Sequence, residues 1–173
     1  VKIEDAFWAP RQKTNRLVTI PHTFKECEET GRLKNFDLAA KAARTGYKGY
    51  VFDDSALYKC LEAAAYALDE QSDPALDKQV DVIIARVAAA QRPDGYLNTY
   101  YEINSPEKRF TNLADNHELY CAGHLFEAAA AHYRATGKKN LLDVATKYAD
   151  LLCATFGDGP GKRMGYCGHP EIE

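Results

Sequence analysis

The feature of this 173-residue sequence that most limits its fold is a helical hairpin pattern that occurs twice. The segment LEAAAYAL at residues 61–68 recurs as FEAAAAHY at residues 126–133, and each is followed by a turn and a second helical segment. The first helix of each pair is rich in small residues, which is typical of a helix buried between neighbours, whereas the second has a clear polar face. Repeated helical hairpins form solenoids or closed double-layered rings. We therefore predict an all-α fold.

Helices are expected throughout, because no run of alternating apolar and polar residues is long enough for a convincing sheet. Capping residues, prolines and glycines indicate where the helices start and stop. Pro21 should kink or restart the first helix. The predicted helices cover residues 11–30 and 116–135, and others begin near Asp53 or Asp54, at Pro74, at Asn140 and near His169.

The number of hairpins is small for a closed ring. Six hairpins of roughly 50–65 residues each would need about 300–390 residues, and repeat arrays need neighbours or caps at their ends. This sequence supplies between two and three hairpins. We expect residues 1–173 to be one part of a larger barrel, or an open arc whose ends are covered by another copy in a homo-oligomer.

Charge and composition exclude several classes of function. The net charge of −3 leaves no broad basic surface, so we expect no nucleic-acid partner. No stretch approaches the roughly 20 apolar residues of a membrane span, so we expect no membrane partner. The five cysteines form no CxxC pair, which suits free thiols in a reducing, cytoplasmic compartment. Val1 is not a natural start, so a periplasmic or secreted location stays open if a leader was removed.

Two histidines are predicted at equivalent positions of successive inner helices. His117 follows Asp115-Asn116, and His169 lies in GYCGHPEIE at the end of the sequence. A helix start presents free N–H groups and a positive dipole end, which favours a neutral imidazole that both donates and accepts hydrogen bonds. The loops that lead into successive inner helices of a ring meet at one mouth, where two such imidazoles suit the hydroxyls of a sugar. The alternative is that each histidine only caps its own helix.

Three further residues are weaker candidates for substrate binding. The loop from Pro93 to Tyr101 turns at Asp-Gly and contains Tyr96, which can stack on a sugar ring, and Asn98, which can hydrogen-bond to one. The alternative is a structural loop whose tyrosines cover the core. Asp54 is a candidate for a substrate contact, although a helix cap is the simpler interpretation.

Metal binding and covalent catalysis have little support in the sequence. His117, Cys121 and His124 share one helix face at a spacing that could hold zinc, but their alanine-rich surroundings favour packing, so we predict no metal on these residues. A pair of catalytic carboxylates cannot be identified. The sequence contains no phosphate-binding glycine loop and no nucleophile elbow.

Several motifs, taken in order, resemble one known family. They are FWAPRQKTNRLVTIPHTF, VFDDSALYKCLEAAAYAL, AAAQRPDGYLNTYY, FTNLADNHELYCAGHLFEAAAAHYRATGKKNLLDVATKYAD and GYCGHPEIE. Together they are similar to the N-terminal part of glycoside hydrolase family 127, the beta-L-arabinofuranosidase family, along nearly the whole sequence.

The resemblance implies an (α/α)6 barrel, here truncated before its catalytic half, and a retaining glycosidase that acts on arabinofuranose-containing oligosaccharides. It also implies a zinc-bound cysteine nucleophile, a glutamate acid/base, and a zinc held by three cysteines and a glutamate. Those motifs belong to the later half of the barrel, so this sequence is expected to contain no catalytic residue and no metal ligand. The family's substrate-binding histidines match His117 and His169.

Two other functions remain open at this point. An α-helical scaffold could bind a protein or peptide in its concave face, and the tyrosine-rich loops would serve it equally well. An unsaturated-uronide hydrolase on the same barrel would need a catalytic aspartate, for which Asp54 or Asp115 could be offered.

Overall fold

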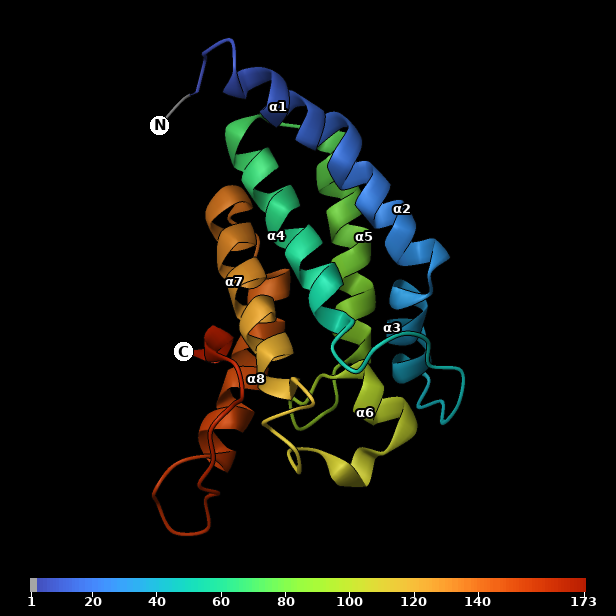
Figure 1. The fold of residues 1–173 in the computed structure, drawn as a ribbon, viewed down its shortest axis with the longest axis vertical. Coiled ribbons are helices and arrows are strands. Elements are labelled where there is room, and N and C mark those ends of the chain that lie inside the picture. The colour runs from blue at the N-terminus through green and yellow to red at the C-terminus, as the bar shows by residue number, and fades with distance from the viewer. Residues whose placement is uncertain (1–2) are drawn as a thin grey trace.

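The computed structural model describes residues 3–173, and within them the fold is all-α, as predicted (Figure 1). The only bridge between extended segments in this range joins Phe156 and Arg163. The helical elements are α1 (Trp8–Thr14), a π-helical turn (Asn15–Thr19), α2 (Ile20–Glu29), α3 (Arg32–Ala40), α4 (Asp54–Glu70), α5 (Pro74–Ala90), α6 (Thr99–Asn104), η2 (Pro106–Lys108), α7 (Glu118–Thr136), α8 (Asn140–Thr155) and η3 (Pro170–Ile172).

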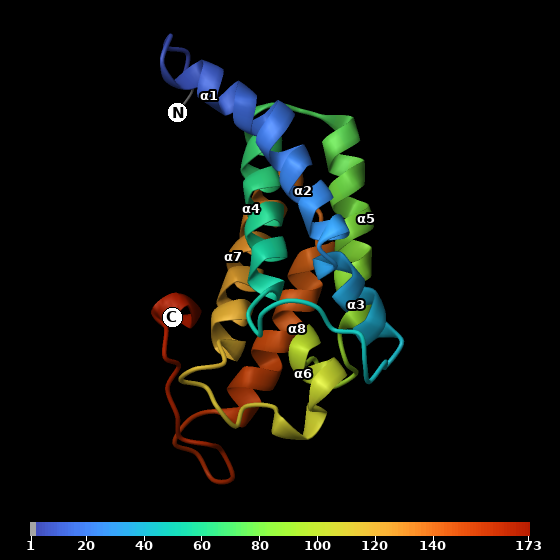
Figure 2. The same cartoon turned by 45° about the vertical axis from the view of Figure 1, so that its right-hand side comes forward.

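Two helical hairpins, α4–α5 and α7–α8, lie side by side (Figures 1 and 2). The most extensive helix–helix contact joins α4 and α7, whereas α5 packs on α8 behind them. Alanines at the α4–α7 contact, such as Ala64 and Ala128, are fully buried, and their small size lets the two helices approach closely. This arrangement of parallel first helices and outer second helices is the one expected of part of an (α/α)6 barrel.

The first predicted helix is interrupted as its proline requires. Pro21 lies in the first turn of α2, directly after the π-helical turn of residues 15–19. A proline ring clashes with the carbonyl four residues earlier, and a wider turn relieves that clash. The helix therefore does not restart at Pro21, and its irregularity takes the form of a π-helical turn directly before α2.

Two predicted helix starts need correction. α7 begins at Glu118 rather than at residue 116, because His117 has a left-handed backbone with φ 57° that cannot belong to the helix. The predicted last helix near His169 is a short 3-10 turn over Pro170–Ile172, for which His169 is the N-terminal flanking residue.

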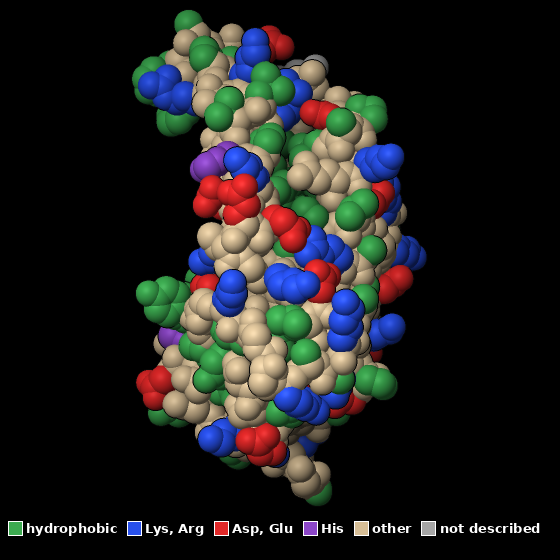
Figure 3. All heavy atoms as spheres, turned by 90° about the vertical axis from the view of Figure 1, so that its right-hand side faces the viewer, with side chains coloured by type: hydrophobic (Ala, Val, Ile, Leu, Met, Phe, Trp, Pro, Cys, Tyr) green, Lys and Arg blue, Asp and Glu red, His purple; other side chains and the backbone are tan. Residues whose placement is uncertain are grey.

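The surface over α2, α3 and α5 carries both signs of charge. Figure 3 shows Lys and Arg interspersed with Asp and Glu on this face. Arg86 of α5 illustrates the pairing, because its guanidinium lies 2.5 Å from Glu28 and 2.9 Å from Asp37. None of the helices in residues 3–173 combines the length and apolar character needed to cross a membrane.

The two ends of the hairpins differ in what surrounds them. α4 and α7 both begin toward the lower end in Figure 1, where the loop containing α6 also lies, and the C-terminal turn packs beside α7. The helix α1 crosses the opposite end, above the last turn of α4. Both predicted histidines therefore belong to one end of the molecule.

Candidate functional site

His117 lies half-buried at the start of α7. Its Nδ1 is 2.7 Å from the backbone oxygen of Asp115. A carbonyl oxygen can only accept a hydrogen bond, so Nδ1 carries the proton and the Nε2 of a neutral His117 is left as an acceptor. The ring also packs against Phe52, with 5.4 Å between ring centroids.

His169 has the opposite hydrogen-bonding pattern. Its Nδ1 accepts a hydrogen bond from the backbone N–H of Glu171 at 3.2 Å, which leaves Nε2–H as a donor in the neutral ring. The side chain thereby caps η3, as the simpler sequence interpretation expected, yet the residue stays half-exposed. The two histidines can present one acceptor and one donor, which is the complement that a sugar hydroxyl requires.

Tyr120 lies between the two imidazoles. Its ring centroid is 4.7 Å from that of His169 and 5.4 Å from that of His117, and both contacts are edge-to-face. Lys59 of α4 donates a hydrogen bond to the Tyr120 hydroxyl. Sequence reasoning missed Tyr120, because only the folded chain brings it against His169, 49 residues later. We call His117, Tyr120 and His169 the imidazole wall.

A hollow of about 500 Å³ adjoins one side of this wall. It is lined by apolar groups of α7 and α8, including Leu119, Phe126 and Leu152, and by His169 and Cys167 of the C-terminal segment. His117 does not line it. The structure thus brings both imidazoles onto one aromatic ring, but it does not enclose them in one cavity.

Tyr96, one of the weaker candidates, lies in the interior. Its side chain is 0% exposed, and its hydroxyl donates a hydrogen bond to the Glu118 carboxylate. The other carboxylate oxygen accepts from the backbone N–H of Phe110 at 2.8 Å. Burial raises the pKa of Glu118 to about 7, against the lowering effect of these two hydrogen bonds. A ring packed in this way has no free face, so the expected stacking of Tyr96 on a sugar is corrected to a structural role.

Asn98 and Asp54 are equally enclosed. Asn98 caps α6 by accepting a hydrogen bond from the Tyr101 N–H at 3.1 Å. Asp54 accepts from the backbone N–H of Thr99 at 2.7 Å and from its hydroxyl at 2.5 Å. Burial raises the pKa of Asp54 to about 6, although both bonds from Thr99 lower it. Both residues are buried away from solvent, although the Nδ2 of Asn98 makes no hydrogen bond within residues 3–173. Asp54 ties the loop to α4 instead of capping its own helix.

We call Tyr96, Asn98, Asp54 and Glu118 the buried network. It holds the loop of residues 91–110 against the starts of α4 and α7. Glu118 had no distinguishing signal in the sequence, because its partners come from residues 96 and 110.

The sequence spacing of His117, Cys121 and His124 does not produce a metal site. The Cys121 thiol is buried and donates a hydrogen bond to the Phe52 carbonyl at 3.5 Å. Burial raises the pKa of this thiol well above its usual range, whereas a metal needs the thiolate. Two other groups of potential ligands occur in residues 3–173, namely Glu62, His124 and Glu127, and Asp77, Asp81 and His132.

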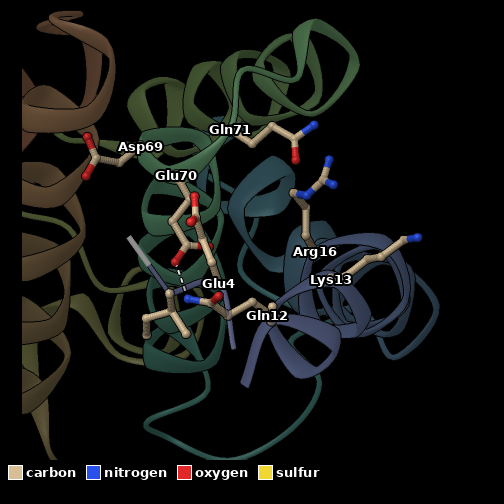
Figure 4. Close-up of a pocket in the computed structure, with 9 residues that line it drawn as sticks. Glu4, Gln12, Lys13, Arg16, Asp69, Glu70 and Gln71 are labelled. Carbon is tan, nitrogen blue, oxygen red and sulfur yellow. Dashed lines mark hydrogen bonds between the residues drawn. The ribbon is translucent and has the colours of Figure 1, made fainter. Parts of the chain in front are cut away.

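A second hollow, of about 480 Å³, lies at the opposite end of the molecule (Figure 4). It is formed by α1 and the end of α4, and its lining carries Lys13 and Arg16 together with Glu4, Asp69 and Glu70. The Gln12 amide donates a hydrogen bond to Glu70 there. Because both signs of charge are mixed, this hollow has no evident preference for a charged ligand, and the imidazole wall is the better candidate site.

Residues 1–173 match the family model described as "Beta-L-arabinofuranosidase, GH127 catalytic domain". A "Non-reducing end beta-L-arabinofuranosidase" from Bifidobacterium longum subsp. longum is 45% identical over 143 residues, which make up 80% of this chain and 22% of that protein.

Two solved structures are similar over almost all of the chain. A GH127 beta-L-arabinofuranosidase from Geobacillus stearothermophilus is 46% identical with a TM-score of 0.96, and the match covers 99% of this chain and 28% of that one. A second GH127 beta-arabinofuranosidase is 43% identical with a TM-score of 0.93, over 98% of this chain and 28% of that one. The chain spans less than a third of the length of these relatives.

Proposed function

Because this chain belongs to glycoside hydrolase family 127, we propose that residues 1–173 form the N-terminal portion of a catalytic barrel and supply sugar-binding residues to a beta-L-arabinofuranosidase. The proposed substrate is an arabinofuranose-containing oligosaccharide. His117 and His169 are the proposed binding residues.

The observation that carries this proposal is the complementary pair of imidazole nitrogens. The Nδ1 contacts of the two rings leave an acceptor on His117 and a donor on His169, on either side of Tyr120. A sugar hydroxyl can donate to one ring and accept from the other. Because both Nδ1 atoms are already engaged, the ring orientations are fixed before the sugar binds, which lowers the entropy lost on binding.

The residues present do not fit the zinc set that the family resemblance implies. That set contains three cysteines and a glutamate, whereas the potential ligand groups in residues 3–173 contain no cysteine. We therefore assign no step of the reaction to a metal held by this chain. Of the two aspartates offered for a uronide hydrolase, Asp54 is buried and already bonded to Thr99, so that alternative depends on the exposed Asp115 alone.

The test uses a protein of the relatives' full length that carries this segment. Changing His117→Ala or His169→Ala should lower kcat/KM for a beta-L-arabinofuranoside by about 100-fold each, which corresponds to about 2.7 kcal/mol of lost transition-state binding. The melting temperature should change little, because both side chains are half-exposed. His22→Ala is the matched control, since His22 is an exposed histidine on α2. Turnover that survives both changes would refute the assignment.

A further inference from the structure

Four side chains that the proposed function does not use gather where α4, α7 and η3 meet. Glu62 comes from α4, His124 and Glu127 from α7, and Glu171 from η3. Potential ligand atoms of the first three lie within 4.8 Å of one another. The His124 Nδ1 is also 2.8 Å from Glu171 Oε1. We call these four residues the glutamate–histidine cluster.

The imidazole of His124 is buried without a hydrogen bond. The residue is 8% exposed, and neither ring nitrogen makes a hydrogen bond within residues 3–173. Glu171 Oε1, which lies 2.8 Å from Nδ1 and would pair with a protonated His124, is likewise buried and makes no hydrogen bond within these residues. A buried polar group without a hydrogen-bond partner destabilises the fold, so a ligand that satisfied these atoms would stabilise it.

The cluster also carries uncompensated negative charge. Within residues 3–173, none of the three glutamates forms an ion pair with a lysine or arginine. The closest cation along α4, Lys59, directs its ammonium to the Tyr120 hydroxyl instead.

A second acidic cluster around a histidine of α7 differs from the first because it already contains a lysine. Asp77 and Asp81 of α5 face His132 of α7, and this imidazole is 1% exposed and also makes no hydrogen bond. The Lys138 ammonium, however, lies 2.7 Å from each aspartate. The chain therefore already places a cation at this second cluster, and none at the first.

We propose that the glutamate–histidine cluster binds one divalent transition-metal ion of the Mn²⁺ or Zn²⁺ type. A set of carboxylate oxygens with one imidazole is a ligand combination that such ions accept, whereas an all-oxygen set would favour Mg²⁺ or Ca²⁺. The ion would join three segments that meet beside the imidazole wall, since Tyr120 also contacts the His124 ring at 4.5 Å. Its role would be structural, and it does not depend on the proposed glycosidase activity.

The experiment titrates Mn²⁺ into a protein of full family length that carries this segment, with free Mn²⁺ followed by electron paramagnetic resonance. Mn²⁺ is a suitable probe because carboxylate-rich sites accept it, whereas thiolate sites prefer softer ions. We expect one Mn²⁺ ion to bind per chain at this cluster, in addition to any ions bound by other parts of the full-length protein. His124→Ala and the double change Glu62→Gln with Glu127→Gln should each weaken this site at least about 10-fold. Mn²⁺ should also raise the melting temperature of the unchanged protein and not that of the variants.

His132→Ala is the matched control, because it removes a similarly buried imidazole from the cluster that Lys138 already neutralises. It should leave Mn²⁺ binding unchanged. The proposal fails if the unchanged protein binds no more Mn²⁺ than the double glutamine variant. It also fails if His132→Ala weakens binding as much as His124→Ala does. The double glutamine variant changes Glu62, which is half-buried, and Glu127, which is exposed, so it keeps the test valid if His124→Ala does not fold.

Discussion

The imidazole wall and the buried network both lie at the starts of α4 and α7, and both contain residues whose type suits sugar binding. They differ in whether their polar atoms are already used. His117 and His169 each bond through Nδ1 and stay half-exposed. Tyr96 and Asp54 are buried, and their side-chain oxygens are taken by Glu118 and Thr99. Residue type alone therefore does not identify the binding surface, whereas exposure and free hydrogen-bonding capacity do.

If the polar atoms of the buried network serve to hold the fold together, substitutions in the network should lower the stability of the protein. Glu118→Ala should lower the free energy of unfolding by about 2–3 kcal/mol, because it leaves the Tyr96 hydroxyl and the Phe110 N–H buried without an acceptor. Chemical denaturation of the full-length protein measures this loss. His117→Ala should stay within about 0.5 kcal/mol of the unchanged protein. An equal loss in both variants would erase the distinction between the two regions.

A change that separates the two histidines should act on activity. A Cβ at Gly168 would come within 2.0 Å of the Ala114 backbone oxygen, so Gly168→Ala must push the segment that carries His169 away from the segment that leads into His117. We expect kcat/KM to fall by about 10-fold, or about 1.4 kcal/mol, with most of the native structure retained. Gly159→Ala is the control, because its added Cβ meets only the Lys162 side chain at 3.6 Å. Full activity in Gly168→Ala would show that the spacing of the wall is unimportant.

The comparison also predicts an effect on the pH dependence of stability. The folded protein keeps a proton on Glu118 up to about pH 7, whereas the unfolded chain releases it near the ordinary value of 4.5. The folded state therefore binds more protons in this window, and this carboxyl's contribution to stability is lost as the pH rises through it. Glu118→Gln should flatten that part of the profile, as measured by thermal unfolding at several pH values. A profile that keeps its slope would mean that Glu118 is ionised in the folded protein.

The sequence predicted the parts of the fold that depend on local pattern. The small residues of 61–68 and 126–133 predicted two buried parallel helices, and α4 and α7 confirm this. The proline at position 21 predicted an irregularity in the first helix, and a π-helical turn lies directly before it. These signals work because periodicity, capping and the missing N–H of proline act within a few residues.

The site was less predictable, because burial depends on partners far away in the sequence. Asp54 resembles a helix cap in the sequence, yet its carboxylate bonds to Thr99, 45 residues later. The left-handed backbone of His117 also could not be foreseen, since histidine adopts it only where the surrounding structure requires it. Tyr120 could not be linked to both histidines from the sequence either, because its contact with His169 joins residues 49 positions apart.

The central claim is that His117 and His169 bind the same sugar from either side of Tyr120. The most direct measurement is a crystal structure of a full-length protein that carries this segment, with L-arabinofuranose bound. The account predicts that the Nε2 atoms of both histidines lie about 2.7–3.2 Å from oxygens of one sugar ring. A sugar that occupies the barrel while either Nε2 points away from it would contradict the account.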